Sequence, residues 1–193
     1  MNLKNDRLRL GLSRHIGRRH GMKQFAFLLV LVATVVSIAA YMAPASGQAD
    51  EQAAPFVTKI PPGYRDWRFI SVAHEEGNLN SFAAVLGNDV AIKAYREGKL
   101  PFPDGTIIAA LHYRFVPSEE NNKAFGRAQS FVAGAPTNVQ FMVKDSKKYA
   151  STGGWGFAHF NDGKPADEAF MKTCFPCHQK MNERDFVFTR YAP

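Results

Sequence analysis

The stretch TIIAALHYRFV, residues 106–116, decides the fold because it predicts a long and well-buried strand. It begins directly after Pro103-Asp104-Gly105, a sequence typical of a tight turn. The run is dominated by apolar, β-branched and aromatic side chains, which favour a strand that is buried in a sheet. Those side chains are Ile107, Ile108, Leu111, Tyr113 and Phe115.

Shorter segments on both sides of this stretch predict the rest of the domain. Strands are expected at residues 67–73, 139–143, 155–160 and 185–191. Helical spacing is expected at residues 88–97, with Asn88 as the N-cap, in a turn at 147–150, and at 167–178. The sum predicts an α+β fold, mainly antiparallel β-sheet with short helices, in one domain over residues 64–193.

Residues 1–49 have the organisation of a secretory signal peptide. Basic residues dominate positions 1–24, an uncharged run of 19 residues follows at 25–43, and small-residue sites end near Ala49. An uncleaved membrane anchor is the alternative, since a spanning helix needs roughly 18 apolar residues. Either way, the positive residues before the run keep that end in the cytoplasm. We therefore expect a periplasmic domain, joined through a proline-rich linker at residues 50–63.

Most of the net charge of the whole chain comes from residues 1–49. The 24 Lys and Arg residues against 17 Asp and Glu give a net charge of +7. Cleavage after Ala49 removes seven bases and one acid, which leaves 17 bases against 16 acids and a net charge of +1. The sequence therefore predicts no nucleic-acid partner. The remaining cluster of Lys144, Lys147 and Lys148 is interrupted by Asp145, and we interpret it as a solvated helix face.

Both cysteines of the chain lie in one pentapeptide, Cys174-Phe175-Pro176-Cys177-His178. On a helix these two thiols and the imidazole share one face, so the thiols reach the two vinyl groups of a haem while the imidazole reaches its iron. The spacing predicts one covalently attached haem c with His178 as the proximal iron ligand. Proline inside the motif suggests that the helix restarts there.

Three other interpretations of the cysteines have less support. A zinc site needs four ligands, and the sequence has no second Cys or His pair of suitable spacing. A thioredoxin-like dithiol normally lies near a βαβ pattern, which is not visible here. A structural disulfide over so small a loop stabilises little.

The sixth iron position decides between electron transfer and ligand binding. Met181 lies too close to His178 in sequence to reach the opposite side of the haem. Met142, His74, His112 and His159 are the other candidates, and a place in the sheet or in solvent is the alternative for each of them.

Several segments, in order along residues 64–193, together resemble the cytochrome P-460 family, which includes the cytochrome c′-beta group. Besides the haem motif and the Pro103-Asp104-Gly105 turn, the matching segments are Tyr64-Arg65-Asp66-Trp67, Val143-Lys144-Asp145-Ser146, Gly154-Trp155-Gly156-Phe157 and Val187-Phe188-Thr189-Arg190. The resemblance implies a homodimer, a largely antiparallel sheet and a five-coordinate haem with an open distal face. It also implies, in the name-giving members, oxidation of hydroxylamine.

Two departures from the family pattern shift the functional interpretation. The haem of the name-giving members is also bonded to a lysine amine, and Ala110 stands at that position here. Those members also use a distal carboxylate before the first haem cysteine, where Ala169 aligns and Asp167 and Glu168 are adjacent. An alanine cannot form the amine linkage, so the chain is more similar to the c′-beta group, whose aromatic distal side binds nitric oxide.

The leading hypothesis is thus an exported mono-haem cytochrome whose open iron site binds small nitrogen-oxide ligands, nitric oxide or hydroxylamine, with a redox partner protein. The first alternative is a hydroxylamine oxidoreductase that uses Glu168 or Asp167 as its base, and the second is a plain electron-transfer cytochrome c. Four phenylalanines are candidates for an aromatic distal lid, with a place in the core as the alternative for each: Phe102, Phe115, Phe131 and Phe141.

Overall fold

The structure, a computed structural model, describes residues 54–192. The expected signal peptide, residues 1–49, and the first four residues of the expected linker lie outside this range. Within it, the helices are all too short or too polar to cross a membrane.

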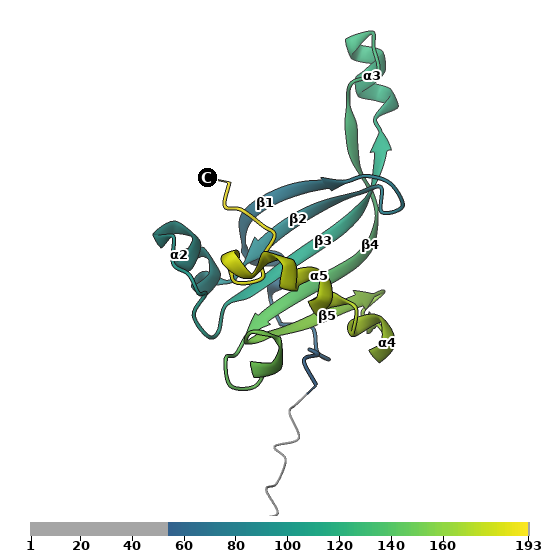
Figure 1. The fold of residues 1–193 in the computed structure, drawn as a ribbon. Helices are drawn as coiled ribbons and strands as arrows, with labels where there is room; N and C mark the ends of the chain where they lie inside the picture. The colour runs from purple at the N-terminus through teal and green to yellow at the C-terminus, as the bar shows by residue number, and fades with distance from the viewer. Residues whose placement is uncertain (1–53, 193) are drawn as a thin grey trace, which may run out of the picture. The chain divides into compact units, whose positions relative to one another are not determined.

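Six strands form one antiparallel sheet in which each strand pairs with the next along the chain (Figure 1). The stretch that decides the fold forms β3, which pairs with β2 on one side and β4 on the other. The prediction of an α+β fold with a mainly antiparallel sheet is confirmed. The strands are β1 (Arg68–Glu75), β2 (Ser81–Gly87), β3 (Ile107–Pro117), β4 (Phe131–Lys144), β5 (Trp155–Asn161) and β6 (Lys164–Pro165).

Besides the two-residue β6, two longer parts of the sheet were not predicted by the sequence analysis. Strand β2 (SFAAVLG) is rich in small residues, and β4 begins at Phe131, eight residues before the predicted start at position 139. Gly134 and Pro136 in that extension are poor strand formers. These segments form strands because neighbouring strands supply their hydrogen bonds, which local sequence does not reveal.

The helices that the structure describes are short. The predicted helix at 88–97 forms α2 (Asp89–Glu97), and the Asn88 side chain accepts a hydrogen bond from the Ala91 backbone N–H at 3.0 Å, as an N-cap does. The sequence analysis missed α3 (Glu119–Phe125). Residues 54–192 also contain three short 3-10 helices: η1 (Tyr64–Asp66), η2 (Ala150–Thr152) and η3 (Gln179–Arg184).

The helix expected at 167–178 is broken into α4 (Glu168–Met171) and α5 (Cys174–His178). Pro176 is the third residue of α5, where a backbone N–H would have no partner within the helix. Proline is therefore tolerated there, and the helix restarts at the haem motif as its proline suggested.

The prediction of a last strand at 185–191 is wrong. Asp185 and Phe186 have φ values of 51° and 66°, which place two successive residues in the left-handed region and turn the chain away from an extended path. Residues 187–191 then run outside the six-stranded sheet, and Ala192 N–H donates to the carbonyl of Ile70 at 2.9 Å.

The two faces of the sheet are covered by different parts of the chain. Paired residues on neighbouring strands point to the same face, and side chains alternate between faces along each strand. We call the face that bears Ile108, Met142 and Phe157 the front face, and the face that bears Phe141 the back face. Helix α5 lies over the front face (Figure 1), and Tyr64 of η1 packs edge-on against Phe141 on the back face at 5.2 Å.

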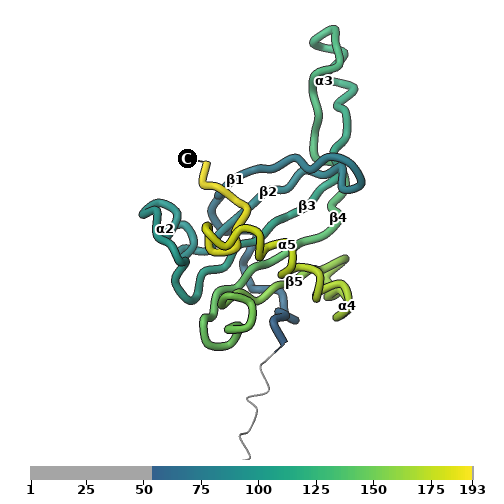
Figure 2. Tube along the Cα trace, in the orientation of Figure 1, coloured from purple at the N-terminus to yellow at the C-terminus, as the bar shows by residue number. Residues whose placement is uncertain are grey.

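The ends of β3 and β4 extend beyond the sheet as an arm that carries α3 at its tip (Figure 2). Phe115 and Phe131 stack in the arm with their ring centroids 4.2 Å apart. The described part of the expected linker runs beside β5, where the Val57 N–H donates to the carbonyl of Phe157 at 2.7 Å. The arm thus lies away from α5, whereas Phe56 of the linker lines a groove together with Phe157 and Phe175.

Candidate haem site

Helix α5 brings Cys174, Cys177 and His178 together within five residues, as the spacing predicted. Both cysteines are free thiols; Cys174 is half-buried and Cys177 is exposed. Burial, together with the neighbouring Cys177, raises the pKa of the Cys174 thiol above its ordinary value. Two free thiols beside an imidazole form the donor set that a c-type haem requires.

The imidazole of His178 is held in one tautomer. Its Nδ1 lies 2.7 Å from the carbonyl oxygen of Phe186, which can only accept, so Nδ1 carries the proton and Nε2 keeps a free lone pair. Burial lowers the pKa of His178, and the hydrogen bond to Phe186 opposes that effect in part. A neutral imidazole with Nε2 free is the form that binds a metal ion.

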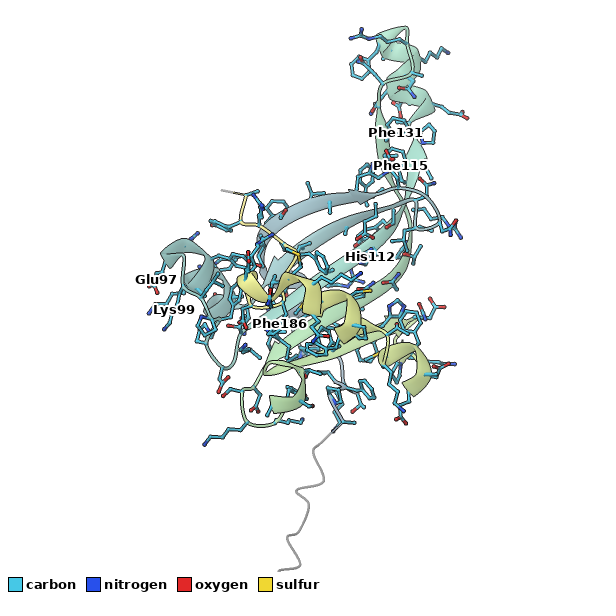
Figure 3. The ribbon with its side chains drawn as sticks, in the orientation of Figure 1. Glu97, Lys99, His112, Phe115, Phe131 and Phe186 are labelled. Atoms are coloured by element: carbon cyan, nitrogen blue, oxygen red, sulfur yellow. The ribbon has the colours of Figure 1, made fainter. Side chains whose placement is uncertain are left out.

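Aromatic rings surround this imidazole. The ring centroid of Phe157 lies 4.9 Å from that of His178, and the centroid of Phe188 lies 5.0 Å from it. Phe186 packs against Phe175 at 5.6 Å, next to the haem motif (Figure 3). The contact with Phe157 places His178 over the front face of the sheet.

A buried ion pair includes Asp185, the first residue of the left-handed turn at Asp185 and Phe186. The Nζ of Lys144 donates to both carboxylate oxygens of Asp185, at 2.8 and 2.9 Å, and to the carbonyl of Gly153 at 2.9 Å. Lys144 is 5% exposed and Asp185 is 8% exposed. The sequence analysis placed Lys144 on a solvated helix face, which is wrong: Lys144 ends β4 and points to the buried front face. The signal was present, because Lys144 lies two residues after Met142 and strand alternation puts both on one face.

Ala110 lies on the same front face as His178. The register aligns Ala110 with Val85 on β2, with Gln140 on β4 and, through Gln140, with His159 on β5. The expected alanine in place of a lysine is thus on the face covered by the haem motif. Lys144 does not replace the missing lysine amine, because its Nζ donates hydrogen bonds to Asp185 and to the Gly153 carbonyl.

The next row of the front face contains a polar cluster that the sequence analysis did not assemble. His112 is buried, its Nδ1 lies 3.4 Å from the Ser81 hydroxyl, and the Glu75 carboxylate is 3.7 Å away. Burial lowers the pKa of His112, and the Glu75 charge partly opposes this. Register could have revealed the cluster, since His112 follows Ala110 by two residues and shares its face.

The other candidates for the sixth ligand divide between the two faces. His159 is on the front face, and its Nε2 lies 3.1 Å from the Asn161 side-chain oxygen. Met142 is buried in the core of the same face. His74 pairs with Phe82 on the back face and stacks on Phe115 at 4.0 Å, which separates it from the haem motif.

The two carboxylates proposed as catalytic bases both have local partners. Asp167 caps α4 by accepting from the Phe170 N–H at 2.8 Å. Glu168 forms an exposed ion pair with Lys172 at 2.8 Å. Glu168 also lines a groove of about 410 Å³ on the Phe175 and Pro176 side of α5, which also includes Phe56, Phe157 and Met171.

The four phenylalanines considered for a distal lid lie in two other places. Phe102 and Phe141 are in the buried core, 5% and 2% exposed. Phe115 and Phe131 stack on each other in the arm, away from Phe186 and α5 (Figure 3). The alternative of core packing holds for Phe102 and Phe141.

Comparison with known families agrees with this geometry. Residues 61–189, which include the sheet and the haem motif, match the family described as Cytochrome P460. The chain belongs to the cytochrome P460 family. A search of curated proteins gave no match.

Membership of the cytochrome P460 family makes this chain a haem c cytochrome, and its residues fit that cofactor. Cys174 and Cys177 supply free thiols, and His178 supplies a neutral imidazole with a fixed tautomer. The aromatic surroundings of His178 are compatible with a large apolar macrocycle.

Proposed function

We propose that this cytochrome is exported to the periplasm, binds one haem covalently through Cys174 and Cys177, and uses His178 as the proximal ligand. When bound, the haem supplies an iron coordination position for small ligands and one-electron chemistry. The proposed ligands are small nitrogen oxides, above all nitric oxide. A soluble redox partner and a homodimer complete the proposal, on the strength of the family resemblance.

The observation that carries this proposal is the position of Ala110. Its methyl group lies on the front face that α5 covers, and it aligns there with Val85 and Gln140. The lysine amine that is bonded to haem in the hydroxylamine-oxidising members has no counterpart at this position. Small and uncharged side chains at Ala83, Val85 and Ala110 favour binding of a small neutral molecule.

Hydroxylamine oxidation receives less support from the same geometry. Asp167 already accepts a hydrogen bond from its own helix, and Glu168 is neutralised by Lys172. The groove that Glu168 lines borders Phe175 and Pro176, rather than the three residues that bind the haem. We therefore rank ligand binding above oxidation of hydroxylamine.

Absorption spectroscopy of the purified haem-loaded protein tests the proposal. We expect an ordinary c-type Soret band after reduction, features of high-spin ferrous iron, and a new spectrum on titration with nitric oxide. A strongly red-shifted Soret band would contradict the interpretation of Ala110. Sharp low-spin bands together with no response to nitric oxide would indicate a sixth protein ligand, for which His112 and His159 are the first residues to replace.

A further inference from the structure

We propose that the buried Lys144–Asp185 ion pair positions the proximal imidazole, by holding the left-handed turn whose Phe186 carbonyl accepts the His178 Nδ1 proton. This inference rests on the proposed role of His178 as iron ligand. It adds two positioning residues that contact neither the thiols nor the imidazole directly.

The ion pair is fully satisfied although it is buried. Lys144 Nζ donates to Asp185 Oδ1, to Asp185 Oδ2 and to the Gly153 carbonyl. The Asp185 carboxylate also accepts from the Phe102 N–H at 2.8 Å. A buried ion pair adds little to stability, because the cost of desolvating both charges offsets most of their attraction. We therefore infer that this fully hydrogen-bonded pair has a role other than stability.

The turn that this pair holds is unfavourable for its own residues. Asp185 and Phe186 are both L residues with positive φ, 51° and 66°, and side chains at successive left-handed positions are strained. The Asp185 side chain is fixed by Lys144 and Phe102 on one side of the turn. On the other side the Phe186 ring lies against Gly153, where an added Cβ would overlap it.

Lys144 and the Phe186 ring both contact Gly153. Together these contacts fix the orientation of the Phe186 carbonyl. Gly153 accepts from Lys144 through its oxygen and makes room for Phe186 at its Cα. The Phe186 carbonyl is thereby aimed at His178 Nδ1, 2.7 Å away. A hydrogen bond to the distant nitrogen of a ligating histidine fixes its orientation and raises its basicity toward the metal.

We expect loss of the ion pair to change the electronic properties of the haem iron rather than the fold of the chain. A more basic proximal imidazole donates more strongly to iron and favours the ferric state. When the turn loses its anchor, the His178 hydrogen bond weakens. The iron–histidine stretching frequency should then fall and the reduction potential should rise.

The test compares haem-loaded full-length protein with two double variants. Lys144→Met/Asp185→Asn removes the buried pair without leaving an unpaired buried charge, and asparagine still accepts from Phe102 and tolerates the left-handed region. Lys93→Met/Glu97→Gln is the matched control, because it removes an exposed ion pair of 3.9 Å on α2 with the same change in net charge. Resonance Raman spectra of the ferrous protein and redox titrations are recorded for all three.

We expect the iron–histidine band to shift down only in the Lys144–Asp185 variant. The ferrous-to-ferric ratio at a fixed potential should rise by a factor on the order of ten, which is ~59 mV for one electron. An unchanged band and potential in a folded variant would overturn the inference, and so would equal changes in the control. If the variant fails to load haem, Asp185→Asn alone is measured by the same two methods and judged by the same outcomes.

These measurements separate the inference from the proposed function. The potential can be titrated whether or not iron has a sixth ligand and whether or not nitric oxide binds. A normal response to nitric oxide with an unchanged proximal signature refutes only the positioning role. A changed potential without nitric oxide binding refutes only the proposed ligand.

Discussion

The two ends of the front face of the sheet differ in how closely their polar side chains are paired. At the lysine end, defined by Lys144, Trp155 and Asp185, the charged groups are paired, and the C-terminal turn covers them. At the histidine end, defined by Ala110, His112 and Glu75, small residues alternate with polar side chains whose contacts are longer, 3.4 Å or more. His178 belongs to the lysine end, through Phe186.

The two ends of this face therefore suit different roles in the proposed function. Short hydrogen bonds between Lys144 and Asp185 hold the turn whose carbonyl accepts from His178, the proposed iron ligand. In the proposed function, the longer contacts at the histidine end would let its side chains adapt to the ligand.

The largest effect is expected where the cofactor is attached. The double variant Cys174→Ala/Cys177→Ala has no thiol for a thioether bond, so covalent haem should be lost completely. Haem-stained denaturing gels and intact-protein mass spectrometry measure this directly. Retention of covalent haem would contradict the attachment site, and Lys180→Ala on the neighbouring η3 serves as an exposed control.

The next effect concerns the stability of the lysine end. Lys144→Met alone leaves the Asp185 carboxylate buried without its ion-pair partner, which should cost about 3–5 kcal/mol of unfolding free energy. The Lys144→Met/Asp185→Asn variant should recover most of that loss. Urea unfolding of the three proteins gives the comparison. A single variant as stable as the parent would mean that the pair is solvated, contrary to its burial.

Local sequence patterns predicted most of the fold but not the parts that depend on distant partners. The β3 stretch and the α2 N-cap were predictable because burial and capping leave a mark on neighbouring residues. Strand β2 was not, since its small residues gain strand geometry from β1 and β3. The wrong last strand shows the same limit, because the turn at Asp185 depends on Lys144, 41 residues earlier.

In the candidate site, too, local features could be predicted and contacts between distant residues could not. Spacing alone predicted a site at Cys174, Cys177 and His178, because the three lie within five residues of each other on one helix. The acceptor for His178 was hidden, since a backbone carbonyl has no residue signature. His112 was considered as an iron ligand or as a residue of the sheet, but its contact with Ser81 was not predicted, because Ser81 lies in the strand that the sequence analysis missed.

A smaller, spectroscopic effect is expected at Ala110. The variant Ala110→Lys places an amine on the front face at the position that is bonded to haem in the name-giving members. We expect part of the reduced Soret absorbance to move to longer wavelength. The control is Ala84→Lys, which adds an amine to the back face of β2. A red shift of equal size in both variants would contradict the assignment of faces.

The smallest effect should come from the pH dependence of the histidine end. Burial lowers the folded-state pKa of His112 below its ordinary value of 6.5, so the unfolded chain binds a proton that the folded chain resists. The unfolding free energy should therefore fall as pH decreases from about 6.5 toward the lower folded-state pKa. His159 contributes in the same direction, because burial also lowers its pKa. The diagnostic is thus a difference: the slope between pH 7 and 5 should be shallower in His112→Gln than in the parent. Parallel slopes in urea unfolding would show that the Glu75 carboxylate compensates the burial of His112, and that the histidine end is as fully paired as the lysine end.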